Sequence, residues 1–148
     1  MRSGLVVLLS LAGLGAPAGV PGEPQGYRVV VHASNSVGEL SSEDVARLFL
    51  KKVRTWPDGR MAAPVDQSVT SPVRASFGRD VLGLSVGAQK DYWLKQTLSG
   101  REVPPRALEG DAAVLEFVAA QQGGIAYVSQ ETPLPSSVRV LRVAAQCA

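Results

Sequence analysis

The sequence has few of the side chains that most often carry catalysis or bind metals. It holds one histidine, His32, and one cysteine, Cys147, in 148 residues. With one residue of each type, the sequence disfavours a cysteine–histidine metal site and a cysteine–histidine nucleophile pair. The chain also has no nucleophile elbow, no phosphate-gripping Walker loop and no zinc-protease helix motif. The sequence therefore predicts a protein that is not an enzyme, with no catalytic residue, metal or cofactor, and gives His32 no role.

Other absences limit the fold and the partners. A single cysteine excludes a disulfide within the chain, and Cys147 is either a terminal thiol or a bridge to another chain. The sequence also lacks a large excess of charge of one sign, since it has 15 basic and 13 acidic residues. A nearly neutral chain lacks the electrostatic footprint of a nucleic-acid-binding protein. The apolar content of 45% is sufficient to bury a core.

Long hydrophobic runs are absent apart from a short one near the N-terminus. Arg2 precedes the apolar residues 5–14, and Ala16-Pro17-Ala18 follows them. This order is typical of a secretory signal peptide. The run is shorter than the ~20 residues that a spanning helix needs, so a membrane anchor is the weaker alternative.

We expect residues 1–18 to be removed, which places the protein in the periplasm or outside the cell. The processed chain would have no membrane-spanning segment. Residues 19–26 are rich in proline and glycine and predict a flexible leader. Residues 27–148 are then long enough for one domain.

Within that domain, strands alternate with helices. Apolar or alternating runs predict strands at residues 27–32, 61–66, 125–128 and 137–143. Cap signals predict helices that begin after Ser41, Ser71, Ser85 and Asp111. This alternation predicts an α/β fold in which helices cover a central sheet.

The first two helices have the clearest start signals. Ser41 and Asp44 form a capping box, with Leu40 and Val45 spaced as a hydrophobic staple. Two lysines, at positions 51 and 52, are expected in the last turn, where they favour the negative end of the helix dipole. Ser71 followed by proline marks the second helix. Three apolar residues, at positions 73, 77 and 81, share its inner face, and Gly83 ends it.

The order of these motifs resembles that of the phosphate-binding proteins of phosphate ABC importers. The segment LSSEDVARLFLKK at 40–52, followed by RTWPDG at 54–59, is similar to the family pattern LS-x(3)-L-x-x-IFLGK-x-x-x-W-x-x-G. The segment SPVRASF at 71–77 is similar to the family's phosphate loop and the helix after it. GGIAYV at 123–128 resembles the family strand GAIGYV. The resemblance covers most of residues 28–130.

The resemblance implies one lobe of a periplasmic-binding-protein fold, with a mixed central sheet and about four flanking helices. Full members of the family close two lobes over their ligand, and this chain has residues for one lobe only. The family's arginine is replaced by Gln67, and its Gly-Ser-Gly-Thr turn reads Thr70-Ser71-Pro72-Val73. Proline has no amide hydrogen to donate. The resemblance therefore implies a reduced phosphate site.

We expect the remaining anion donors at the start of the second helix, where backbone N–H groups are free and the helix dipole is positive. The expected ligand-binding residues are Ser71, Thr70, Arg74, Gln67 and Val73 in this segment, and Asn35 and Ser34 from the opposite loop.

Ser71 and Arg74 also have simpler interpretations. Ser71-Pro72 is a helix-start signal in its own right. Arg74 is either a ligand for the anion, an exposed surface residue, or a partner of Asp66, and that last pairing would weaken anion binding. The tryptophans, Trp56 and Trp93, favour packing over ligand stacking.

Two functions fit the sequence. The first is an extracytoplasmic, solute-binding-like protein that binds phosphate or another small oxyanion and works with an ABC permease. The second is a non-transport module of the envelope that recognises a partner protein or a surface polymer. An accessible pocket with Ser71, Arg74 and free amides would favour the first function. A filled site with an apolar patch elsewhere would favour the second.

Overall fold

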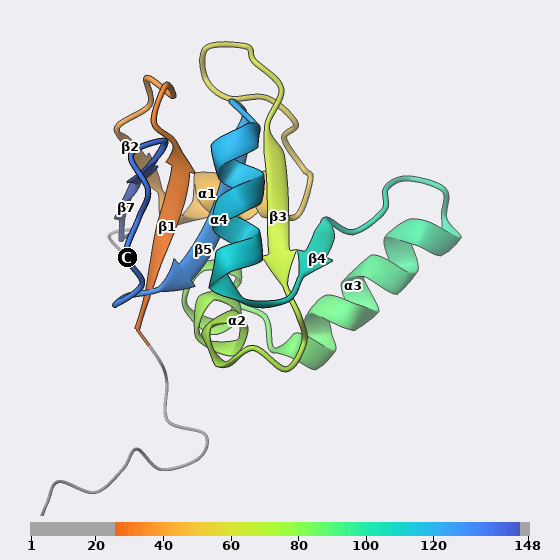
Figure 1. The fold of residues 1–148 in the computed structure, drawn as a ribbon. Helices are drawn as coiled ribbons and strands as arrows, with labels where there is room; N and C mark the ends of the chain where they lie inside the picture. Colours follow the sequence, from red (N-terminus) through yellow and green to blue (C-terminus); the bar gives the residue numbers. More distant parts are fainter. Residues whose placement is uncertain (1–25, 146–148) are drawn as a thin grey trace, which may run out of the picture.

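A computed structural model describes residues 26–145 of the chain (Figure 1). The expected signal peptide, nearly all of the expected leader, and Cys147 lie outside the described residues. Five strands form the central sheet in the order β4-β3-β5-β1-β6. They are β1 (Tyr27–His32), β3 (Ala63–Gln67), β4 (Arg106–Leu108), β5 (Gly124–Ser129) and β6 (Val138–Val140). A second, parallel pair joins β2 (Glu39–Ser41) to β7 (Arg142–Ala144).

The central sheet is mixed. β3 runs parallel to both β4 and β5, whereas β1 is antiparallel to β5 and to β6. The carboxyl ends of β3, β4 and β5 therefore lie at one edge of the sheet, together with the beginning of β1. The end of β1 lies at the opposite edge, because Tyr27 pairs with Ser129 and Val31 with Ile125.

Helices cover both faces of this sheet. α4 (Gly110–Ala120) packs on one face, where Val114 and Val118 meet Val30, Val65 and Ala126. On the other face, α1 (Ser42–Phe49) and α2 (Pro72–Phe77) form the larger core cluster with the strands. A π-helical turn (Gly78–Leu82, η1) continues α2, and Gly83 ends it in the left-handed conformation, as expected. α3 (Val86–Leu98) stands beyond β4, away from the sheet (Figure 1).

Local start signals predicted two helices well. The side chain of Ser41 accepts a hydrogen bond from the backbone N–H of Asp44, at 3.1 Å, and Ser85 does the same for Ala88. Leu40 and Val45 are both buried in the core, as the staple requires. The expected α/β architecture, with four α-helices in residues 26–145, is confirmed.

Several boundaries were wrong. α1 ends at Phe49, so the two lysines after it follow the helix, and Lys51 takes a left-handed backbone with φ of 54°. β3 begins at Ala63, where the N–H of Ala63 donates to the carbonyl of Gly123. The expected strand at 137–143 is broken at Leu141. The Leu141 side chain is buried, and the backbone N–H of Leu141 donates to the carbonyl of Val29 in β1. After Leu141 the chain leaves β1, and β7 pairs with β2.

Candidate functional site

A pocket of about 350 Å³ opens at the carboxyl ends of β3, β4 and β5. Parallel strands place the segments that follow them at the same edge of a sheet, and ligands of open α/β sheets bind outside such strand ends. Ten residues line this pocket, from the β3–α2 loop, the start of α4 and the end of β5: Gln67, Ser68, Thr70, Ser71, Pro72, Val73, Glu109, Gly110, Asp111 and Ser129. Five of the seven expected site residues lie on the β3–α2 side, and four of these five line the pocket.

Gln67, at the end of β3, is the centre of a polar network beneath the pocket. Its side-chain N–H₂ donates to a carboxylate oxygen of Asp111 at 2.8 Å and to the carbonyl of Tyr127 at 2.9 Å. Its side-chain oxygen accepts from the Ser71 hydroxyl at 2.7 Å. The residue is 2% exposed. Both hydrogens of its amide are therefore engaged within the protein, and the donor expected from Gln67 is directed at Asp111 and Tyr127.

Ser71 stands at the N-cap position of α2, but its side chain does not cap the helix. Its hydroxyl hydrogen goes to Gln67, so the oxygen keeps only acceptor capacity toward a ligand.

Arg74 points away from the pocket, into the protein. Its guanidinium donates to the carbonyl of Gln67 at 2.6 Å and approaches a carboxylate oxygen of Asp66 at 3.3 Å. The side chains of Arg74 and Asp66 are 10% and 11% exposed. The pairing of Asp66 with Arg74 that the sequence left open is thus present. Because Arg74 is absent from the pocket lining, the expectation that it supplies the cation there is not met.

Tyr127 completes the buried part of the network, and it was not among the expected site residues. Its hydroxyl donates to Asp66, and the backbone N–H of Gln67 donates to the same carboxylate oxygen at 2.9 Å. Burial raises the pKa of the Tyr127 hydroxyl well above its usual value, and the negative charge of Asp66 raises it further. The ring stacks on Phe77 with a centroid distance of 4.1 Å. No local sequence signal indicated this contact, because Asp66 and Tyr127 are far apart in the chain.

Asp111 was expected to cap α4, and this expectation was wrong. The helix begins at Gly110, and the Asp111 carboxylate instead joins three segments. It accepts from Gln67, from the backbone N–H of Ser129 at 3.1 Å and from the Thr132 hydroxyl. These partners are distant in sequence, whereas a cap bonds to its own first turn.

The charge on the pocket wall is negative. Glu109 and Asp111 contribute carboxylates, and no lysine or arginine is among the ten lining residues. The positive end of the α4 dipole opposes this charge in part.

A few donors remain open to a ligand. Ser68 and Thr70 share one hydrogen bond between their hydroxyls at 3.1 Å, so one of the two hydroxyl hydrogens is available. The backbone N–H of Val73 has no acceptor among residues 26–145. The N–H of Arg74, in contrast, donates to the Ser71 carbonyl at 3.1 Å, so it is not one of the free backbone N–H groups expected at this helix start. The pocket therefore offers neutral donors only.

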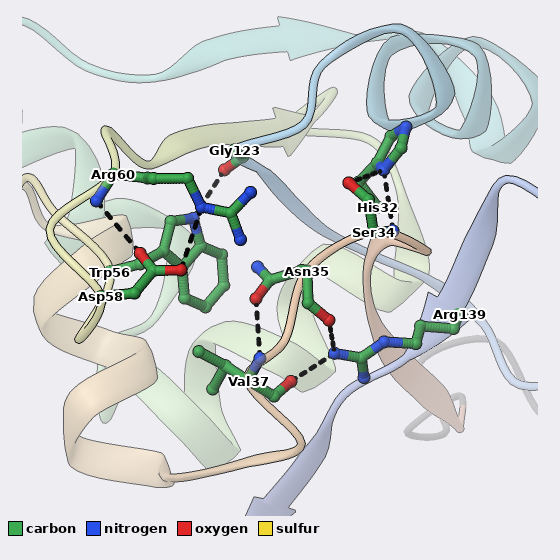
Figure 2. A network of polar contacts seen from close by, with 9 residues as sticks. All are labelled: His32, Ser34, Asn35, Val37, Trp56, Asp58, Arg60, Gly123 and Arg139. Carbon is green, nitrogen blue, oxygen red and sulfur yellow. Dashed lines mark hydrogen bonds and ion pairs between the residues drawn. The ribbon is translucent and has the colours of Figure 1, made fainter.

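Asn35 and Ser34 lie at the other edge of the sheet. They follow β1, which is antiparallel to β5, so the expectation that they close the pocket from the opposite loop is wrong. Figure 2 shows their contacts. The side-chain oxygen of Asn35 accepts from the backbone N–H of Val37 at 2.9 Å, and the Ser34 hydroxyl lies 2.7 Å from Nδ1 of His32. Arg139 donates to the carbonyls of Asn35 and Val37, which fixes the loop to β6.

The tryptophans pack as expected. Trp56 is 2% exposed, and its Nε1–H donates to the carbonyl of Gly123 at 3.0 Å (Figure 2). Trp93 is buried on the inner side of α3.

Within residues 26–145, no cluster of three potential metal ligands occurs. In that same range, none of the helices combines the length and the hydrophobicity that crossing a bilayer requires.

Comparison with known proteins gives structural relatives only. No protein-family model and no curated protein matches the sequence. A putative phosphate ABC transporter substrate-binding protein from Clostridium perfringens, solved with bound phosphate, is 18% identical and superposes with a TM-score of 0.63. That match covers 80% of this chain and 45% of the other. An ABC-type phosphate transport receptor from Vibrio cholerae is also 18% identical, with a TM-score of 0.62 over 80% and 46% of the two chains.

A possible phosphate binding protein from Planctomyces limnophilus is 13% identical, with a TM-score of 0.57 over 82% and 42% of the two chains. This chain thus spans less than half the length of the solved chains it matches. The likeness shows the fold, which is that of a single lobe of a periplasmic-binding protein.

Proposed function

We propose that this protein is an extracytoplasmic binding lobe, without enzymatic activity, that captures a small oxyanion such as phosphate at the carboxyl ends of β3 and β4. The observation that carries this proposal is the position of the 350 Å³ pocket in a fold shared with phosphate-binding proteins. The pocket lies outside the ends of adjacent parallel strands, where open α/β sheets bind their ligands.

The donors available there are of the kind that binds an oxyanion. The N–H of Val73 and a hydroxyl of the Ser68–Thr70 pair supply hydrogen bonds, and the first turn of α4 adds its dipole. An ABC permease or another envelope protein would be the macromolecular partner in this function.

The affinity should be low. A hydrogen bond that involves a charged group contributes about 1.5–3 kcal/mol, whereas a neutral one contributes about 0.5–1.5 kcal/mol. Arg74 is held by Asp66, and two carboxylates stand on the pocket wall, so charge assistance is missing. A few neutral bonds correspond to dissociation constants of about 1 mM, for which the binding free energy is about −4 kcal/mol.

Calorimetric titration of the purified protein with phosphate and with sulfate tests this proposal. A Thr70→Val variant should bind about three- to tenfold more weakly, because it loses one neutral donor. A Ser34→Ala variant serves as the control, since Ser34 lies at the other edge of the sheet. Absence of saturable heat with both anions up to about 50 mM, far above the expected constant, would remove the proposal.

A second candidate is a non-transport envelope module that recognises a partner protein or a surface polymer. The commitment of Gln67, Ser71 and Arg74 to internal bonds favours it, as do leucines exposed on α3, a helix remote from the pocket. If this candidate is correct, neither anion binds, whereas changes on α3 affect the protein's association.

A further inference from the structure

α3 buries residues on one side and exposes apolar side chains on the other. Gln89 and Trp93, four residues apart, are 1% and 8% exposed on the side that faces the protein. Leu94 and Leu98, also four residues apart, are 55% and 79% exposed. Each leucine follows one of the buried residues by five positions, which is about 140° around a helix with 3.6 residues per turn. The two leucines therefore form a solvent-facing pair that the fold does not use.

The inner side of α3 is fixed to the domain. The Tyr92 hydroxyl donates to the carbonyl of Leu50 at 2.9 Å, and the side chain of Gln89 donates to Leu84 at 3.2 Å. A rotation of the helix that buried the leucines would break the bond between Tyr92 and Leu50 and expose Trp93. The leucines are thus held outward by the structure.

Basic residues surround this leucine pair. Lys90, Lys95 and Arg101 are exposed on or just after α3 together with the acidic Asp91, while the nearby Glu102 is paired with Lys51 and Arg54. Among the described residues, none of the first four charges has an ion-pair partner, in contrast to the exposed pairs elsewhere, such as Arg47 with Glu43 and Arg79 with Asp80. The α3 surface therefore carries a net charge of about +2 around two leucines, a pattern that attracts anionic lipid surfaces.

The shape of this surface favours lipid over protein as its partner. α3 projects from the domain beyond β4 (Figure 1), and no α3 residue lines any of the described hollows. A convex ridge without a hollow offers no pocket for a partner's side chain, whereas leucines can enter the boundary between lipid headgroups and acyl chains without one.

We propose that α3 docks on the surface of an anionic phospholipid membrane, with Leu94 and Leu98 entering the interface and Lys90, Lys95 and Arg101 contacting lipid phosphates. This contact does not depend on solute binding. It would hold the lobe at the membrane while leaving the pocket at the strand ends free.

Co-sedimentation with vesicles tests this proposal. The purified protein should bind vesicles made of mixed phosphatidylglycerol and phosphatidylcholine. It should bind vesicles of pure phosphatidylcholine at least about tenfold more weakly, because those vesicles lack the negative charge that attracts the basic residues of α3. A Leu94→Ser, Leu98→Ser double variant should lose about tenfold or more of its binding to the mixed vesicles. A Lys90→Gln, Lys95→Gln variant should lose a similar factor, and added salt should erase that difference.

The matched control changes Met61 and Val140 to serine, since both are exposed apolar residues outside α3. This control should bind vesicles as the unchanged protein does, and thermal melts should show all variants folded.

No binding to mixed vesicles would overturn the proposal, as would equal losses in the control and leucine variants. Binding to a soluble acidic protein with none to vesicles would also overturn it. Phosphate titration of the leucine variant should be unchanged, so failure here and failure of the proposed function are distinguishable.

Discussion

The two edges of the central sheet use polar side chains differently. At the carboxyl ends of β3 and β5, side chains bond to one another as well as to the backbone, in a network centred on Gln67, Asp111 and the Asp66–Arg74 pair. At the opposite edge, side chains bond mostly to the backbone: Arg139 donates to the carbonyls of Asn35 and Val37, and Trp56 donates to the carbonyl of Gly123. The first arrangement makes each side chain depend on its neighbours and leaves few donors for a ligand. The second arrangement fixes loops to neighbouring strands.

The largest effect on stability is expected from breaking the buried ion pair between Asp66 and Arg74, at the carboxyl end of β3. Arg74→Met would leave the Asp66 carboxylate buried with Tyr127 and one backbone N–H. Removing one partner of a buried pair costs about 3–5 kcal/mol. Urea unfolding should show this loss, while Arg79→Met, which removes an exposed pair with Asp80, should change stability by less than about 1 kcal/mol. Adding Asp66→Asn to Arg74→Met should recover part of the loss, and a double variant as unstable as the single one would contradict the network.

A smaller effect is expected at the other edge. Arg139→Met removes charge-assisted bonds to two carbonyls, but Arg139 is partly exposed, so solvent screening should keep the loss below that of Arg74→Met. Because these bonds fix one loop, amide exchange should accelerate in residues 33–38 far more than in β5. Uniform acceleration across the sheet would show that the two edges do not act separately.

Alkaline pH should lower the stability of the folded protein through the buried Tyr127. Burial and Asp66 raise the pKa of Tyr127 in the folded protein above its unfolded value near 10. The stability that this group contributes is therefore complete below pH 10 and is lost as pH rises above it, by up to about 1.4 kcal/mol per pH unit. Burial, with Asp80 nearby, also raises the pKa of Tyr27, to about 12. Unfolding measured between pH 9 and 11.5 should show a shallower decline in Tyr127→Phe than in the unchanged protein, and an unchanged slope would contradict this assignment.

The smallest effect concerns the pocket charge. Glu109→Gln removes an exposed carboxylate from the wall and should strengthen phosphate binding about three- to tenfold at low salt, with a smaller gain at high salt. Glu116→Gln removes the same charge from an exposed position on α4 outside the pocket lining. Equal effects of the two substitutions would place the anion elsewhere.

Local features of the fold were predictable from the sequence, and contacts between distant segments were not. Ser41 and Ser85 cap their helices because a cap bonds within its own first turn. Asp111 also precedes an apolar helical pattern, as a cap does. Its carboxylate instead accepts hydrogen bonds from β3, from the end of β5 and from the turn after β5. Asn35 was misplaced because the direction of β1 depends on its pairing with β5, which no local pattern contains. Ser71 lines the pocket at the strand ends, whereas the bonds that engage Gln67 and Arg74 come from neighbours that only the folded chain brings close.

The most direct test follows backbone amide signals of the isotope-labelled protein as phosphate is added at constant ionic strength. We predict saturable shifts at about millimolar phosphate for Thr70, Val73 and Gly110, with the signals of Asn35 and Val37 unchanged. Shifts that fail to saturate, or that appear first around Asn35, would contradict the assignment of ligand binding to the carboxyl edge of the sheet.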